Sequence, residues 1–145
     1  MSAAEPPSEP SLFEQLGGEP ELRRIVTRFV DRVMGDVMIG FFFARVDRSR
    51  LIQRELEFSA RHLGADIPYT GRTMPAAHAP HHIMGAHFMR RLQILKETLK
   101  ELQVSPHIAQ HWIDHTMKLL PQITTHPASE CAAPLPAGEV SEKVL

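Results

Sequence analysis

The chain has 145 residues, of which 43% are hydrophobic, and its formal net charge is −1. This length suits one domain with a buried core, and the balanced charge argues against a nucleic-acid interface or a cationic membrane-surface helix. The first residues lack the regions of a signal peptide, and no apolar run approaches the ~20 residues that span a bilayer. We expect a cytoplasmic protein. Its lone Cys131 allows neither an internal disulfide nor a cysteine-based metal site.

The first helix is predicted to follow a short tail. Residues 1–10 are rich in Pro, Ser and Glu, a composition that favours disorder. Ser11 and Glu14 have the spacing of a capping box, and Gly17 and Gly18 are typical of a helix end. We therefore place the start of the domain at Ser11.

The second helix is predicted to begin at Glu19–Pro20, with the proline in its first turn, and to end near Gly35. Its apolar residues recur at helical spacing, which indicates a helix with one face in the core. These residues are Leu22, Ile25, Val26, Phe29, Val30, Val33 and Met34.

The third helix follows three consecutive aromatic residues, Phe41 to Phe43, of which at least one should face inward. Asp47 or Ser49 is the expected cap of this helix, which runs to about Leu63, before Gly64.

Glu55 is the anomaly of the third helix. It lies between Leu51 and Phe58 on the face that should be buried. A buried carboxylate must be paired, protonated or bound to something. A distal role in a binding pocket and an outward orientation toward solvent or Arg54 both remain open.

The segment from Met74 to Phe88 is the most informative part of the chain. Met74 and His78 share one helical face, and Pro80 limits this helix to about one turn. Apolar residues such as Ile83 and Phe88 surround His78 in the sequence. A histidine in apolar surroundings can hold a metal, and together with the three aromatics it favours a flat hydrophobic cofactor such as haem.

Two long helices complete the domain. One begins near Gly85, and the other begins at Ser105–Pro106 and should bury Ile108, Trp112, Leu119 and Ile123. Residues 124–145 read as a flexible tail. Because no strand pattern appears, we predict an all-α fold with a domain at residues 11–123.

A second group of histidines offers an alternative site. His107, His111 and His115 recur at four-residue steps on the last helix, and histidines so spaced can share a zinc ion. We favour a solvated edge, because no acidic or sulfur ligand lies on the same side. His62 either reaches toward the cofactor or lies at a helix end, where a cation is favourable.

Several motifs follow one another along residues 11–123. They are Leu12–Gly18, Arg28–Val33, Phe42–Phe43 and Pro68–Gly71, followed by Met74 and His78. Together they resemble the truncated haemoglobins of the first group. The resemblance implies a two-over-two helical sandwich with haem b between the second and third helices and the last two.

The resemblance also implies roles for single residues. His78 is the expected iron ligand, although His81 or His82 would replace it if the segment were shifted. The residues expected around the haem are Val30, Phe43, Leu51, Arg54, Phe58, Met74, Ile83 and Phe88. Val30 stands where the family usually has a tyrosine, and Glu55 where it often has a glutamine.

These departures suggest which chemistry to expect. Val30 donates no hydrogen bond to bound oxygen, and Glu55 helps only when protonated. We therefore expect binding of oxygen, NO or CO with redox or detoxification chemistry, either peroxidase-like or nitrite- or NO-processing, rather than stable oxygen storage. Glu55 is the expected distal acid or base. A non-catalytic ligand sensor or haem carrier is the alternative. A reductase is an expected partner, and the monomer and the weak homodimer both stay open.

Overall fold

The computed structural model describes residues 9–71, 73–78 and 81–124, and of Met74 and Pro75 only the backbone. In these residues the chain is helical and contains no strand. In chain order the elements are α1 (Leu12–Leu16), α2 (Gly18–Met34), the 3₁₀ helix η1 (Gly40–Phe43), α3 (Arg48–His62), α4 (Met74–His78), α5 (Gly85–Glu101), α6 (Pro106–Met117) and α7 (Leu120–Ile123). None of these helices is long and apolar enough to cross a membrane.

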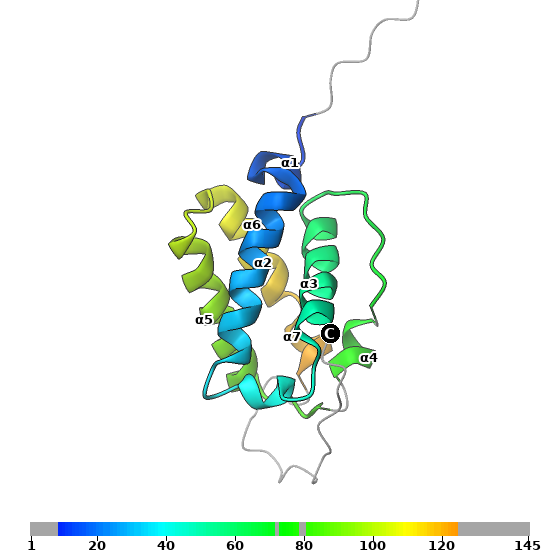
Figure 1. Cartoon of the computed structure of the whole chain (residues 1–145), viewed down its shortest axis with the longest axis vertical. Coiled ribbons are helices and arrows are strands. Elements are labelled where there is room, and N and C mark those ends of the chain that lie inside the picture. The colour runs from blue at the N-terminus through cyan, green and yellow to red at the C-terminus, as the bar shows by residue number, and fades with distance from the viewer. Residues whose placement is uncertain (1–8, 72, 79–80, 125–145) are drawn as a thin grey trace, which may run out of the picture.

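The four long helices form two layers (Figure 1). The pair α2 and α3 packs on the pair α5 and α6, through contacts of α2 with α5 and of α3 with α6. This arrangement confirms the predicted two-over-two sandwich. The short helices α4 and α7 contact each other, and both lie near the lower end of α3 in Figure 1.

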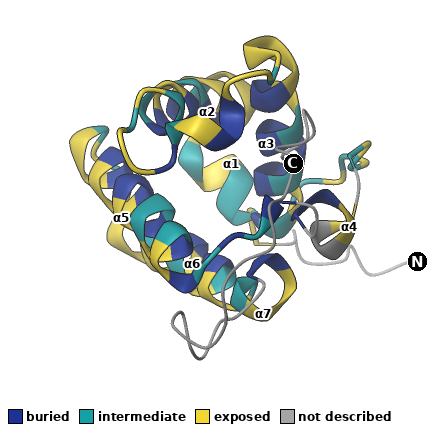
Figure 2. Ribbon diagram, turned by 90° about the horizontal axis from the view of Figure 1, so that it is seen from below, coloured by how far each residue is buried: buried dark blue, intermediate teal, exposed yellow. Residues whose placement is uncertain are grey.

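The core runs between the two layers. The apolar stripe predicted for the second helix is buried along α2 from Leu22 to Val33, and α5 contributes Phe88, Leu92 and Leu99. Seen from the side drawn in Figure 2, buried stretches face the middle of the molecule and exposed residues mostly follow its outer edges. Burial of apolar surface at about 25 cal/mol per Å² is the main force that holds these layers together.

Local hydrogen bonds define the helix starts that the sequence indicated. The Glu14 amide donates to Ser11 Oγ at 3.1 Å, and the Arg50 amide donates to Asp47 Oδ1 at 3.2 Å. Of the two candidate caps of α3, Asp47 therefore fills the role, while Ser49 lies inside the helix.

The corner between α2 and η1 is built around Asp36. Asp36 Oδ2 accepts hydrogen bonds from the amides of Met38 and Ile39, and its Oδ1 accepts two from Arg90 of α5, at 3.0 and 2.7 Å. A Cβ at Gly40 would lie only 2.7 Å from the Met34 carbonyl oxygen, so this corner requires glycine there. The corner turns the aromatic segment toward the interior.

Within that segment, Phe42 and Phe43 are buried and Phe41 is half exposed. The expectation that at least one of the three aromatics faces inward is confirmed.

The prediction of one continuous last helix is wrong. The helix α6 ends at Met117, and a separate turn, α7, begins at Leu120. Pro121 explains the break, because it lacks an amide hydrogen and its ring clashes with the carbonyl four residues earlier, at Met117. As a result Leu119 lies between the two helices and is only partly buried.

The predicted tails, at residues 1–10 and 124–145, lie almost wholly outside the described residues, as does the predicted stop at Pro80.

We expect Asp47→Ala to lower the free energy of unfolding by about 1 kcal/mol, because the Arg50 amide loses its partner at the start of α3. Urea unfolding followed by circular dichroism measures this change. Ser49→Ala, at an exposed position of the same turn, is the matched control and should leave the stability nearly unchanged. An equal loss in both variants would contradict the assignment of Asp47 as the cap.

Candidate functional site

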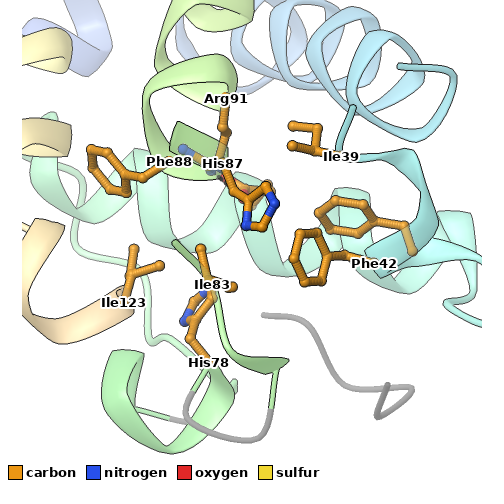
Figure 3. A pocket seen from close by; sticks show the side chains of 10 residues that line it. Ile39, Phe42, His78, Ile83, His87, Phe88, Arg91 and Ile123 are labelled. Carbon is orange, nitrogen blue, oxygen red and sulfur yellow. Dashed lines mark hydrogen bonds and ion pairs between the residues drawn. The ribbon is translucent and has the colours of Figure 1, made fainter. Parts of the chain in front are cut away.

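A cavity lies where η1, α3, α4, α5 and α7 meet. Its volume is about 40 Å³, and it is partly open to solvent. Figure 3 shows the residues around it. Most of its wall is apolar, and four side chains carry polar groups. The lining residues are Ile39, Phe42, Phe43, Glu55, His78, Ile83, His87, Phe88, Arg91 and Ile123.

His78 reaches this cavity from the last residue of α4 and is only 4% exposed. In Figure 3 its ring lies beside Ile83, with Ile123 on the neighbouring wall. Because a buried imidazole is held here among apolar side chains, the position suits a nitrogen ligand to iron in an apolar pocket.

His87 forms part of a second wall together with the aromatic residues of η1. The Met84 amide donates to His87 Nδ1 at 3.0 Å, so that nitrogen carries no proton. The His87 ring packs edge-on against Phe42, with 5.0 Å between the ring centroids. The sequence did not indicate that His87 lines the cavity. Its ring is held there by the hydrogen bond at the start of α5, and no local sequence pattern predicts that hydrogen bond.

Glu55 and Arg91 form an ion pair inside the cavity. Arg91 Nη2 donates to Glu55 Oε1 at 2.6 Å, and their side chains are 20% and 9% exposed. The Arg91 guanidinium also lies over the Phe29 ring, 4.9 Å from its centroid. Glu55 therefore faces the cavity. The alternative that it turns outward, toward solvent or Arg54, is wrong.

The partner of Glu55 is Arg91 and not Arg54. Sequence reasoning missed Arg91, although a signal existed: it lies three residues after Phe88 and four before Leu95, next to the apolar stripe of α5.

Arg54 belongs to a different network, which joins α3 to Thr70. It donates to Thr70 and lies 3.7 Å from Glu57, whose Oε1 accepts hydrogen bonds from the Thr70 amide and hydroxyl. Burial by itself would raise the pKa of Glu57, but hydrogen bonds from Thr70 and Gln53 and the charge of Arg54 outweigh it and hold that pKa below its usual value. This network ties α3 to the segment that precedes α4.

The structure brings five of the predicted site residues to the cavity: Phe43, Glu55, His78, Ile83 and Phe88. Val30, Leu51, Arg54 and Phe58 do not line it. Val30 and Leu51 are buried in the core, and Phe58 is partly buried with its ring against Tyr69 and His62. The side chain of Met74 lies outside the described residues. Ile39, Phe42, His87, Arg91 and Ile123 line the cavity in addition.

The second histidine group forms a stack of rings between α3 and α6. The rings of His62 and His115 lie 4.1 Å apart and nearly parallel, and His111 Nε2 lies 2.8 Å from the His62 carbonyl oxygen. His107 instead contacts Gln15. The described residues contain no group of three or more His, Cys, Asp or Glu side chains that could hold a metal ion. The zinc alternative has no support in this part of the chain.

Burial first, and then the neighbouring His115 and His111, lower the pKa of His62 to about 3. His62 is thus neutral in the folded protein at ordinary pH. Its position at the end of α3 does not make it a cation.

Comparison with solved structures defines the class of fold. The truncated hemoglobin of Tetrahymena pyriformis in its Fe(III) form superposes with a TM-score of 0.74 at 25% identity, over 79% of this chain and 98% of that one. The cyanomet 2/2 hemoglobin of Synechococcus, with covalently attached heme, gives a TM-score of 0.71 at 28% identity, over 74% and 91%. The fold is that of the two-over-two haemoglobins.

Sequence relatives agree. A group 1 truncated hemoglobin of Tetrahymena thermophila is 31% identical over 113 residues, which cover 76% of this chain and 93% of that protein. GlbN, a group 1 truncated hemoglobin of Mycolicibacterium paratuberculosis, is 30% identical over 120 residues, or 83% and 88%. The family model for bacterial-like globins matches residues 11–125. This chain belongs to the bacterial-like globin family, among the group 1 truncated haemoglobins.

The cofactor of this globin is haem b, and the chemistry of the residues around the cavity suits it. The donor set is right for a haem, since the cavity offers a buried imidazole at His78 and apolar walls, with no carboxylate cluster that would favour a bare divalent ion.

We expect the stability of the protein to fall in acid because of the histidine stack. Between pH 6.5 and about 3 the unfolded chain protonates His62 and the folded protein does not, so unfolding takes up a proton and becomes easier as pH falls. The slope from this group is at most about 1.4 kcal/mol per pH unit. Urea unfolding at pH 7, 6 and 5 measures it.

The variant His62→Phe should flatten this dependence, since it keeps a ring in the stack and removes the titrating group. His107→Gln, at an exposed position of α6, is the control and should keep the slope of the wild type. A His62→Phe slope equal to that of the wild type would contradict the interpretation.

Proposed function

We propose that this globin binds small ligands at a haem iron held by His78, and that it carries out redox or detoxification chemistry on them rather than stable oxygen storage. The observation that carries this proposal is the ion pair of Glu55 and Arg91, which lines the same cavity as His78. Bound haem supplies an iron centre that takes up oxygen, NO or CO and exchanges electrons.

The position of His78 supports its role as the iron ligand. It is buried and lines the cavity, whereas His81 and His82, the alternatives, do not line it. His87 also lines the cavity, but its Nδ1 already accepts the Met84 amide. His78 is the last residue of α4, and its ring lies beside the apolar side chain of Ile83 (Figure 3).

The ion pair argues against oxygen storage. Oxygen bound to ferrous haem carries partial negative charge, which Arg91 would stabilise and Glu55 would destabilise. The two effects oppose each other, so the pair offers oxygen little net stabilisation. Val30 adds no donor. A ligand that gives up a proton is stabilised more by this pair, because Glu55 can accept the proton while Arg91 balances the remaining negative charge. Hydrogen peroxide is such a ligand.

A non-catalytic sensor or haem carrier is the alternative function. One observation favours it: Arg91 already satisfies the Glu55 carboxylate within the protein, as in a purely structural pair. Turnover with peroxide separates a catalyst from a sensor.

We expect the protein expressed with haem to show a Soret band and a five-coordinate ferrous form that binds CO, and we expect His78→Ala to lose or alter both. Absorption spectra of the ferric, reduced and CO-bound protein test this. His82→Asn is the matched control, because asparagine tolerates the positive φ of 49° at this position. Unchanged spectra in His78→Ala would contradict the assignment of the iron ligand.

We further expect Glu55→Gln to slow peroxide-dependent oxidation of a reducing dye by about a hundredfold, since the amide accepts no proton. The same variant should form a longer-lived oxygen complex than the wild type, because glutamine can donate a hydrogen bond. Stopped-flow spectroscopy measures both rates. Glu97→Gln changes an exposed carboxylate of α5 outside the cavity and is the control. A long-lived oxygen complex in the wild type would refute the proposed chemistry.

A further inference from the structure

Arg91 has the donor capacity to bind something other than Glu55. A guanidinium carries five N–H donors in a planar fork, and the hydrogen bond to Glu55 Oε1 uses Nη2. One face of the group rests on the Phe29 ring, which fixes its plane. The side chain keeps 20% of its surface exposed, so the group is not sealed in the core.

The charges on the cavity wall are few. Among the lining residues Arg91 is the one side chain with a permanent positive charge, and Glu55 is the one carboxylate. The nearest arginine along α5, Arg90, is paired with Asp36 on the far side of the η1 corner, and Arg54 is paired with Glu57. The polarity of this cavity therefore depends on a single pair of opposite charges.

The geometry points to Arg91 as the residue that determines how strongly small monovalent anions bind in this cavity, with Glu55 as its internal competitor. The inference rests on the proposed function, because the anion would bind at the haem iron in the same cavity. Nitrite and azide are of the right class: both are small, carry one negative charge and accept hydrogen bonds. Arginine's planar fork suits an anion with two acceptor oxygens, as in nitrite.

The two residues act on an anion with opposite sign. Arg91 attracts the anion and donates to it, while Glu55 repels it and occupies the guanidinium. Removing Glu55 should therefore raise anion affinity, and removing Arg91 should lower it. A pair that served only to hold α3 against α5 would not produce this opposition, since loss of either partner would then disturb the cavity in the same direction.

The test is equilibrium titration of the ferric, haem-loaded protein with sodium azide and with sodium nitrite, followed by absorption spectroscopy. CO affinity of the ferrous protein is measured in parallel, because CO is neutral and reports access to the iron alone. The variants are Glu55→Gln, Arg91→Gln and the double variant. Lys96→Gln, which removes an exposed cation of the same helix outside the cavity, is the matched control.

We expect Glu55→Gln to bind azide and nitrite about tenfold more tightly than the wild type. Arg91→Gln leaves a buried carboxylate unpaired and tests folding as well as binding. The decisive comparison is therefore between Glu55→Gln and the double variant, in which both groups are neutral. Loss of the guanidinium there should weaken anion binding about 10- to 100-fold, as expected for a hydrogen bond to a charged group. CO affinity should change less than about threefold throughout.

Equal anion affinities in Glu55→Gln and the double variant, with normal CO spectra, would overturn this role of Arg91 and leave the proposed function standing. A loss of CO affinity as large as the loss of anion affinity would overturn it too, because it would indicate a general disturbance of the cavity. Absence of a Soret band in the wild type would overturn the proposed function and the role of Arg91 together.

Discussion

The ion pair between Glu55 and Arg91 is the interaction on which the character of this globin depends. A carboxylate with so little exposure is costly to bury, and only a close cation makes its inward orientation tolerable. The pair joins α3, in one layer of the sandwich, to α5, in the other. Because of this pair, the cavity contains two fixed and opposite charges rather than a neutral hydrogen-bond donor.

The rest of the fold positions this pair and the histidine that shares its cavity. Asp36 and Arg90 hold the η1 corner on α5, so that Phe42 and Phe43 form an apolar wall. On the opposite flank of α3, the Glu57 carboxylate binds the Thr70 amide and anchors the chain shortly before α4, which carries His78. Each of these polar contacts lies at the edge of the core, where packing between the long helices does not by itself fix the path of the chain.

Local features of the fold could be predicted from the sequence, and long-range partners could not. The helix starts at Ser11 and Asp47 follow from contacts three residues apart, and helical periodicity alone placed Glu55 on a buried face. Glu55 pairs with Arg91 rather than Arg54 because of the way α3 packs on α5. Glu55 and Arg91 are 36 residues apart in the sequence, so no local pattern encodes this pairing. The break before Leu120 follows from Pro121, a local signal that the spacing of apolar residues does not contain. Haem contacts of Val30, Leu51 and Phe58 were inferred from the resemblance alone, and these residues do not line the cavity.

In the proposed function, one cavity is the haem pocket, His78 is the iron ligand, and a charged pair faces the bound ligand. A crystal structure of the ferric, haem-loaded protein with azide tests this most directly. The account predicts His78 bound to iron, azide on the other face of the haem, and a guanidinium nitrogen of Arg91 within about 3 Å of the azide, as in a hydrogen bond. A different histidine on the iron, or Arg91 turned away from the azide, would contradict it.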